Sequence, residues 1–307
     1  MKAFMVIRNK GLGWIRDPID PRDFCLDHSE VKKILTKNNT IKLKALSPED
    51  LPKKVDNREW CSPIEDQGGL ESCTANAGVG MYEYMENKAN GRYINGSRLF
   101  LYKATRLLMG KGGIGDSGAF IRTTLGAIRL FGIPQEEFWP YTDDPVQFDM
   151  MPDPWLWALG QSFQSITHFR LDYSTDANEN VHRIKEYVTN GYPVEFGFYV
   201  YSSADDSWSN GGVIPFPATT EAYNGGHAVL IVGYDDNKAS TNKRDKNTTT
   251  GCFLIRNSWG ESWGEHGYGW FPYQFFQPKF NGDVLADDAW TITNQEWVDT
   301  DEFSPPH

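Results

Sequence analysis

The chain has 307 residues, a length that fits one large domain or two small ones. It is 39% hydrophobic and 23% charged, and its 11 Trp, 14 Tyr and 18 Phe provide enough apolar surface for a sizeable core. The net charge of −11 argues against a nucleic-acid-binding protein, and no apolar run approaches the ~18 residues of a membrane-spanning helix. We therefore expect a globular protein that binds neither nucleic acid nor membrane.

The first residues, MKAFMVIRNKGLGW, hold too short an apolar run for the core of a signal peptide. The sequence therefore predicts a cytoplasmic protein, although export by another route or a missing leader stays open. The cysteines are Cys25, Cys61, Cys73 and Cys252, and no two have the spacing of a zinc or redox motif. We expect free thiols and neither a metal nor a cofactor.

Residues 1–54 differ in charge from the rest of the chain. They contain 12 Lys or Arg and 7 Asp or Glu, whereas the remaining residues contain 18 and 34. A basic segment on an acidic body favours docking within the molecule, and a solvated basic arm is the alternative. Residues 1–50 also lack the pattern of a compact domain, because the prolines in DPIDPRD disfavour helix. We interpret them as a leader segment.

The body of the chain, 51–307, begins with a helical part. Three helices are predicted, at 72–89, 97–109 and 117–132. Ser72 is a plausible N-cap of the first one. Gly78 and Gly80 are costly inside that helix, which indicates that another backbone packs closely against it.

A β-rich part follows from about residue 165. Three strands are predicted, at 192–201, 227–235 and 251–259. The polar segment 237–250 is predicted to be an exposed loop between two of them. The pattern indicates an α+β fold of two lobes, followed by an acidic tail. The expected boundaries are about 58–160 for the helical lobe, about 161–290 for the β-rich lobe and 291–307 for the tail.

Cys73 lies in EDQGGLESCTANAGVG, where a glycine-containing segment leads into the first predicted helix. A thiol becomes a good nucleophile when it loses its proton, and both the positive end of a helix and a nearby imidazolium favour the thiolate. The first turn of this helix therefore suits a catalytic cysteine. A buried thiol that serves as a small hydrophobic side chain is the alternative.

His227 is the histidine best placed to partner this cysteine. It follows NGG and opens the apolar run AVLIVGY, which places its ring at the edge of a predicted strand. Asn257 ends the next strand, and its side chain could accept the imidazole N–H and fix the tautomer. A structural histidine and a turn-forming asparagine are the alternatives for the two residues taken singly.

Three blocks, QGGLESC, NGGHAVLIVGY and NSWGESWGEHGYG, together resemble the active-site blocks of the papain family of cysteine peptidases. LPKKVDNREW resembles the start of a mature papain-like enzyme, and GGIGDSGAFIRTTLGAIRLFGIPQEEFWPY resembles a wall of the substrate cleft. The similarity covers about residues 51–275, with Cys, His and Asn in the expected order. It implies a papain-like fold, with a mainly helical lobe, a β-barrel-like lobe and a cleft between them.

The resemblance also implies roles for single residues. Gln67 matches the oxyanion-hole glutamine, which would act together with the backbone N–H of Cys73. Asn257 would orient His227, and Trp259 would shield their hydrogen bond from water, a plain core tryptophan being the alternative. Cys73 and His227 would rest as a thiolate–imidazolium pair, attack a peptide carbonyl and hydrolyse the resulting thioester.

Substrate-binding positions follow from the same match. Three residues would offer backbone hydrogen bonds, namely Ser117, Gly118 and Ala119. Six more are expected at or beside the pocket for the second side chain before the scissile bond, namely Phe120, Ile121, Gly197, Gly225, Gly226 and Ala228. An apolar or aromatic side chain is expected in that pocket, and ordinary core packing is the alternative for Phe120 and Ile121.

The chain departs from the family pattern at three positions. The family's cysteine three residues before the nucleophile is Leu70 here, and its disulfide partner is Asp116, so that bridge is absent. The aromatic residue that commonly follows the nucleophile is Thr74, which changes the packing beside Cys73 but not the chemistry.

We therefore expect a cysteine endopeptidase that acts on a peptide or protein. Part of residues 10–50 is expected to lie across the cleft as an intramolecular inhibitor, and a permanent structural strap is the alternative for this segment. Two other functions stay open: a thiol-dependent acyltransferase or amidase on the same fold, and a non-catalytic binding protein that kept the fold.

Overall fold

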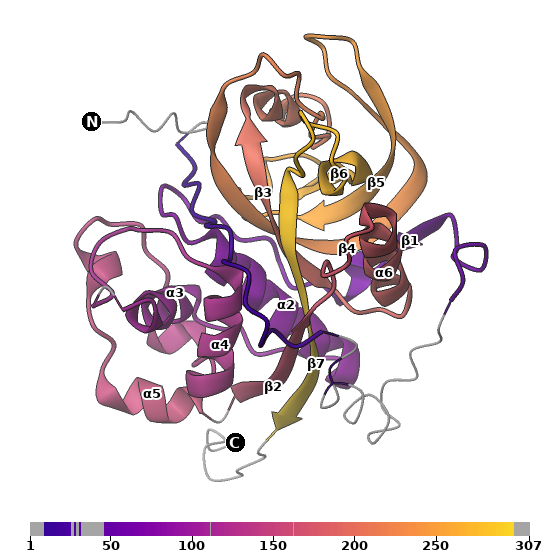
Figure 1. The fold of residues 1–307 in the computed structure, drawn as a ribbon. Helices are drawn as coiled ribbons and strands as arrows, with labels where there is room; N and C mark the ends of the chain where they lie inside the picture. The colour runs from indigo at the N-terminus through magenta and orange to yellow at the C-terminus, as the bar shows by residue number, and fades with distance from the viewer. Residues whose placement is uncertain are drawn as a thin grey trace.

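The computed structural model describes residues 9–25, 28, 31, 46–110, 112–161 and 163–297. A group of helices and a large antiparallel sheet lie side by side as two lobes (Figure 1). This is the two-lobed α+β arrangement that the sequence predicted. In these ranges no helix combines the length and the apolar character needed to cross a bilayer.

Helix α2 (Cys73–Asn90) is the centre of the molecule, because it packs against α3 (Arg98–Leu108), against α4 (Ile121–Phe131) and against the sheet. It ends at Gly91, whose φ of 67° gives the left-handed conformation that glycine adopts easily. The hydroxyl of Ser97 caps α3 by accepting the Phe100 N–H. These three helices were predicted, with ends within a few residues of those observed.

Two details of α2 differ from the prediction. Ser72 occupies the N-cap position, but its hydroxyl makes no capping bond and instead lies 2.6 Å from the Tyr141 hydroxyl. Gly78 and Gly80 face side chains rather than another backbone. A Cβ on Gly80 would lie 2.2 Å from Nη1 of Arg256, and one on Gly78 would lie 3.3 Å from Cγ2 of Thr124. The glycines therefore make room for the side chains of Arg256 on β5 and Thr124 on α4.

The sheet has seven antiparallel strands in the order β2-β7-β3-β4-β5-β6, with β1 paired to β4. Their bounds are β1 (Lys54–Asp56), β2 (Phe163–Arg170), β3 (Val194–Tyr201), β4 (Tyr223–Thr241), β5 (Thr248–Arg256), β6 (Tyr268–Pro272) and β7 (Ala286–Trp297). The predicted strands correspond to β3, β4 and β5. Aromatic side chains such as Phe196, Phe271 and Phe276 fill the core between this sheet and α6 (Ala177–Thr189).

Three features of the second half were not predicted. The helices α5 (Pro154–Gly160) and α6 lie beyond the predicted helical segments. Segment 237–250 is mostly a hairpin rather than a loop, because Ala239, Ser240 and Thr241 pair with β5. Residues 291–297 belong to β7 rather than to an acidic tail. Partners on both sides of β7 satisfy its backbone, since β2 and β3 flank it.

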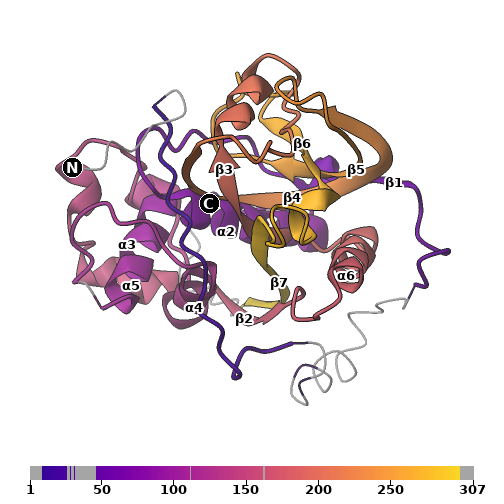
Figure 2. The same ribbon diagram turned by 45° about the horizontal axis from the view of Figure 1, so that its top comes forward.

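The described part of the leader passes between the two lobes (Figures 1 and 2). Gly13 forms a parallel bridge with Gly226 on the sheet, and Trp14 forms one with Ala119 in front of α4. The segment then continues along α4 to Cys25, which pairs with Arg170 of β2. The predicted leader, 1–50, thus crosses between the lobes near residues 13 and 14, within the part expected to lie across the cleft, 10–50. Residues 1–8, 26–27, 29–30 and 32–45 lie outside the described residues.

Candidate active site

His227, Asn257 and Trp259 come together at one end of the β4–β5 pair. His227 lies near the start of β4, and Asn257 directly follows β5. The imidazole Nε2 lies 2.8 Å from Oδ1 of Asn257. The indole of Trp259 stacks on the imidazole with ring centroids 4.6 Å apart and an angle of 25° between the planes. All three side chains are buried, and the indole covers one face of the imidazole.

The tautomer of His227 follows from the contacts of Asn257. The backbone N–H of Ser258 donates to Oδ1 of Asn257 over 2.8 Å, which identifies this atom as the oxygen. Nε2 must therefore carry the hydrogen and donate it. In a neutral ring Nδ1 then holds a free lone pair, and among the described residues it has no hydrogen-bond partner. This nitrogen is available to take a proton from a nearby group.

Cys73 is the first residue of α2, and its sulfur is fully buried between the lobes. Burial raises the pKa of the Cys73 thiol to about 12, although the backbone N–H groups of Ala228 and Gly13 lie against the sulfur and favour the thiolate. The Ala228 amide directly follows His227, so the sulfur lies beside the residue that carries the imidazole. Cys73 and His227 are far apart in the sequence, and the packing of α2 against β4 brings them together.

Burial also lowers the pKa of His227 to about 4, despite the opposing effect of the hydrogen bond to Asn257. The high thiol pKa and the low imidazole pKa show that burial disfavours charge on either group while the leader covers the sulfur. The expected thiolate–imidazolium pair stays a prediction.

Gln67 is held in a fixed orientation by both lobes. Its Oε1 accepts the Ser258 hydroxyl over 2.6 Å, and its backbone N–H donates to the Ser258 carbonyl over 2.9 Å. The side-chain amide can therefore point only one way. Nε2 donates to the carbonyls of Leu70 at 2.8 Å and of Gly11 at 3.1 Å. A carbonyl of the leader thus occupies the place opposite the amide that was expected to bind an oxyanion.

The leader backbone fits tightly into the cleft. The Ala119 N–H donates to the Gly13 carbonyl over 2.8 Å, the Ile15 N–H donates to the Ala119 carbonyl over 3.0 Å, and the Trp14 N–H donates to the Gly226 carbonyl over 3.0 Å. A Cβ on Gly13 would lie 1.9 Å from the carbonyl oxygen of Glu71. Only a glycine can therefore follow this path without moving the chain.

The predicted substrate-binding residues make three kinds of contact. Those that meet the leader or the sulfur are Gly118, Ala119, Gly197, Gly225, Gly226 and Ala228. Ile121 belongs to the same buried cluster as Trp14. The two others make contacts of a different kind: Ser117 donates its hydroxyl to the Gly118 carbonyl, and the Phe120 carbonyl accepts the Thr124 hydroxyl.

Asp116 occupies the position at which the resemblance to the family implied a disulfide-forming cysteine. Both of its carboxylate oxygens lie 3.1 Å from the Glu71 N–H, and Oδ1 accepts the Tyr102 hydroxyl over 2.5 Å. The carboxylate therefore ties the segment before Cys73 to the wall of the cleft by hydrogen bonds. All four cysteines are free, as expected.

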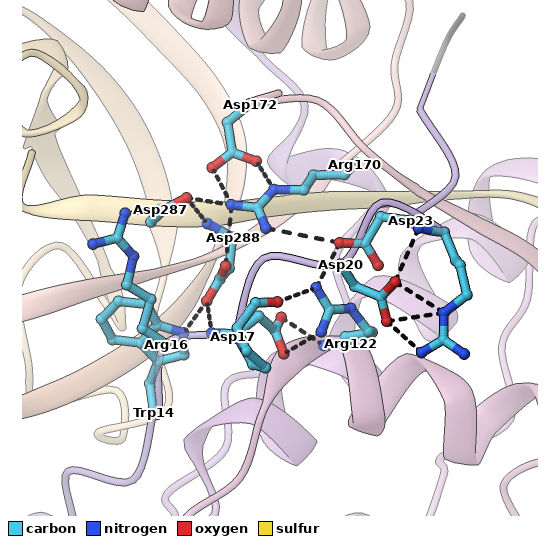
Figure 3. Close-up of polar contacts among 12 residues, drawn as sticks. Trp14, Arg16, Asp17, Asp20, Asp23, Arg122, Arg170, Asp172, Asp287 and Asp288 are labelled. Carbon is cyan, nitrogen blue, oxygen red and sulfur yellow. Dashed lines mark hydrogen bonds and ion pairs between the residues drawn. The ribbon is translucent and has the colours of Figure 1, made fainter. Parts of the chain in front are cut away.

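A cluster of charges that the sequence analysis did not single out lies under Trp14 and Asp17 (Figure 3). Asp288 on β7 accepts the Trp14 indole N–H over 3.1 Å and the Asp17 backbone N–H over 2.8 Å. Arg170 on β2 lies 3.2 Å from the other oxygen of Asp288. Arg122 at the start of α4 pairs with Asp17 and Asp23 of the leader. The leader is therefore fixed by ion pairs beyond the cleft as well as by backbone bonds within it.

Comparisons with known proteins show which family this chain belongs to. Residues 51–275 match the family model described as papain family cysteine protease. A peptidase C1-like protein of Acanthamoeba polyphaga mimivirus is 33% identical over 292 residues, which cover 92% of this chain and 87% of the relative.

Two solved structures show the same fold. Xylellain, a cysteine protease from Xylella fastidiosa, has a TM-score of 0.69 and 31% identity and covers 93% of this chain and 97% of its own. The digestive procathepsin L 3 of Tenebrio molitor has a TM-score of 0.57 and 21% identity, covering 84% and 75%. The chain belongs to the papain family of cysteine proteases, as a hydrolase of peptide bonds.

Proposed function

We propose that the protein is a cysteine endopeptidase in which Cys73 is the nucleophile, His227 the general acid and base, and Asn257 the residue that orients His227. Gln67 and the backbone N–H of Cys73 form the oxyanion hole. The leader, through residues 11–15, holds this site in a covered, inactive form. A peptide or protein substrate replaces the leader in the cleft.

One observation carries the proposal. The sulfur of Cys73 lies against the Ala228 amide, while the neighbouring His227 keeps one ring nitrogen bonded to Asn257 and the other without a partner among the described residues. A histidine that served structure alone would have both ring nitrogens satisfied, because an unpaired buried polar atom is costly. The free lone pair therefore favours a catalytic over a structural reading.

The reaction follows from these contacts. When the leader leaves, water re-enters the cleft, the penalty on charge falls, and the thiol proton can pass to Nδ1 of His227. The thiolate attacks a substrate carbonyl, and Gln67 Nε2 and the Cys73 N–H receive the oxyanion. His227 returns the proton to the leaving amine, which gives a thioester at Cys73. Water then loses a proton to His227 and hydrolyses the thioester, which restores the thiol.

The contacts of the leader support its inhibitory role. It fills the position opposite Gln67 with the Gly11 carbonyl, covers the sulfur with Gly13 and occupies the adjoining pocket with Trp14. A substrate cannot enter while these three contacts persist. The procathepsin with the same fold is, by its name, a precursor form of its protease, and we propose the same kind of form for this chain.

The test uses the full chain and a thiol-reactive epoxide, followed by mass spectrometry of the four cysteines. In the Gly13→Ala chain, whose leader cannot lie in its present place over the sulfur, we expect Cys73 to be labelled and Cys25, Cys61 and Cys252 to be spared. This chain should hydrolyse a peptide library, and the same chain with Cys73→Ala added should not. Equal hydrolysis by both proteins would overturn the assignment. Transfer of the acyl group to an added amine in preference to water would favour the acyltransferase alternative.

A further inference from the structure

We infer that Asp288 forms the floor of the substrate pocket next to the nucleophile and selects peptides whose second side chain before the scissile bond ends in a hydrogen-bond donor, with tryptophan as the best fit. This inference rests on the proposed function. It replaces the expectation of a merely apolar or aromatic preference. The argument starts from the side chain that fills the pocket in the present structure.

Trp14 occupies a pocket directly beside the sulfur. Gly13, the residue before it, has its N–H against Cys73, and the Trp14 ring belongs to the same buried cluster as Cys73, Ala119 and Ala228. The ring is only 4% exposed. A substrate that binds at Cys73 therefore meets this pocket with a side chain close to its scissile bond.

The walls of the pocket leave room for a bicyclic ring. A Cβ on Gly197 would lie 1.9 Å from a ring carbon of Trp14, and one on Gly226 would lie 2.8 Å from another. Any larger residue at either position would thus overlap the indole. Tyr199 closes a further side, with its ring centroid 5.2 Å from that of Trp14. The two glycines set the width of the pocket.

The floor of the pocket is polar, unlike its walls. Oδ2 of Asp288 receives two donors from the leader, the indole N–H of Trp14 and the backbone N–H of Asp17. Asp288 is fully buried, and its φ of 57° is unusual for a residue with a side chain. When the leader leaves, both donors go with it. Water can then donate to this oxygen, and a substrate side chain that displaces the water without donating leaves a buried carboxylate oxygen unpaired, which is unfavourable. A side chain that supplies a donor is therefore preferred.

Arg170 stays beside Asp288 when the leader leaves. Its guanidinium group contacts the carboxyl groups of Asp172, Asp287 and Asp288, and it favours the charged form of Asp288. Arg170 lies on the Oδ1 side of Asp288, whereas the indole meets Oδ2 (Figure 3). Oδ2 is therefore the oxygen that faces the pocket.

The experiment uses the full chain with Trp14→Gly, which empties the pocket. Hydrolysis rates are compared for two peptides that differ only in Trp or Phe at the second position before the scissile bond. We expect kcat/KM to be roughly 10- to 100-fold higher for the Trp peptide, because a hydrogen bond to a charged acceptor gives discrimination of this order. A Phe peptide that is cleaved equally well or faster would overturn the inference.

A second variant, Asp288→Asn in the same background, tests the atom itself. The single oxygen of asparagine will turn toward Arg170, so its NH₂ group faces the indole N–H, and two donors then oppose each other. The preference for Trp over Phe should fall to within about threefold. Asp287→Asn is the matched control, because Asp287 also contacts Arg170 but not Trp14, and it should keep the preference. Loss of the preference in both variants would contradict a specific role of Asp288.

The outcomes separate the inference from the proposed function. If no peptide is cleaved and Cys73 is not labelled, both fail. If peptides are cleaved without a preference for Trp, only the inference fails. Should Asp288→Asn not fold, as judged by circular dichroism, the comparison of the Trp and Phe peptides in the Trp14→Gly chain still decides.

A double-mutant cycle in the chain with an otherwise unchanged leader tests the bond between Trp14 and Asp288. Trp14→Phe and Asp288→Asn should each speed epoxide labelling of Cys73, and their combination should add little, because both remove the same bond.

Discussion

Ser258 is a single residue on which the orientation of the proposed oxyanion hole depends. Its hydroxyl donates to Oε1 of Gln67, its backbone carbonyl accepts the Gln67 N–H, and its own N–H donates to Asn257. One residue therefore fixes both the amide that faces the cleft and the amide that orients His227. It does so from the β-rich lobe, while Gln67 belongs to the segment before α2.

Replacing Ser258 with Ala removes only the hydroxyl bond to Gln67. We expect kcat to fall about tenfold at nearly unchanged KM, because the Gln67 amide loses a neutral hydrogen bond of about 1 kcal/mol and can rotate. Steady-state kinetics in the Trp14→Gly chain measure this. Ser209→Ala is the control, since the Ser209 hydroxyl bonds a carbonyl at an exposed site. An equal loss in both variants would argue against a role of Ser258.

Replacing Gln67 with Ala has a larger expected effect. The loss of one oxyanion donor costs about 2.7–4 kcal/mol of barrier, so kcat should fall about 10²- to 10³-fold. Epoxide labelling of Cys73 should change much less, because labelling builds up no oxyanion on a carbonyl. A parallel fall of both rates would indicate damage to the cysteine rather than to the oxyanion hole.

The sequence predicted the residues around the sulfur because they lie in short local motifs. Cys73, Gln67 and Asn257 each occur in a block of fewer than twenty residues, and His227 opens a strand with a clear apolar pattern. The sequence analysis did not predict the contact between Asp288 and Arg170. These residues meet only through the pairing of β2, β7 and β3, which joins segments far apart in the sequence. Trp14 was not singled out, since nothing in its local pattern marks the side chain that fills the pocket.

At the scale of elements, the described part of the leader is held by the body of the chain and not by contacts of its own. Gly11 and Gly13 lie against the backbone of Leu70 and Glu71, where a Cβ would come within 2.1 Å and 1.9 Å of a carbonyl oxygen. The two glycines are therefore what allows the segment to pass this close to α2.

Helix α6 was missed although its own sequence indicates a helix. Asp176 caps it, and Val181, Ile184 and Val188 have the spacing of a buried helix face, but the predicted strands around this segment hid the pattern.

Replacing Gly13 with Ala in the full chain should open the cleft. The added methyl group overlaps a carbonyl that belongs to the backbone and cannot move freely, so the leader must lift away. We expect epoxide labelling of Cys73 and peptide hydrolysis to rise at least tenfold. Gly126→Ala in α4 is the control, because a Cβ there meets nothing within 4 Å. Unchanged labelling of the Gly13→Ala chain would mean that the leader does not limit access.

At the scale of the whole molecule, the two lobes and the leader meet in one network of charges. Burial raises the pKa of Asp17 to about 6 and that of Asp288 to about 8, and for Asp288 the nearby Asp17 carboxylate adds to the rise. The charged or titratable groups that face this pair are Arg16 and Asp23 of the leader, Arg122 of α4, Arg170 of β2, the following Asp172, Glu195 of β3 and Asp287 of β7. Burial also raises the pKa of Glu195.

These shifts predict that the leader loosens as the pH rises. When the leader undocks, Asp17 enters water and Asp288 loses its neighbour, so both pKa values fall. Protons therefore bind the docked state more tightly. The stabilisation is full at low pH and is lost as the pH passes about 6 to 8. Labelling of Cys73, divided by that of the Gly13→Ala chain, should increase about tenfold or more between pH 5 and pH 9.

The control for this prediction is Asp288→Asn, which cannot titrate and should reduce the rise to the part that Asp17 contributes. Dividing by the opened chain removes the pH dependence of the thiol itself. Faster relative labelling on acidification would contradict the prediction and would indicate that ion pairs with Arg122 and Arg170, rather than the protonated carboxyls, dominate docking.

The direction in which the leader runs through the cleft has one more consequence. Because Trp14 pairs in parallel with Ala119, the group that the leader presents to the sulfur is an amide hydrogen, that of Gly13. A thiolate attacks the carbonyl carbon of a peptide bond, whereas an amide hydrogen only donates a hydrogen bond to the sulfur. Under the proposed function, the leader would therefore not be cut at this position and would be able to return to the cleft after leaving it. We then expect covering and uncovering to be a reversible equilibrium rather than a single irreversible event.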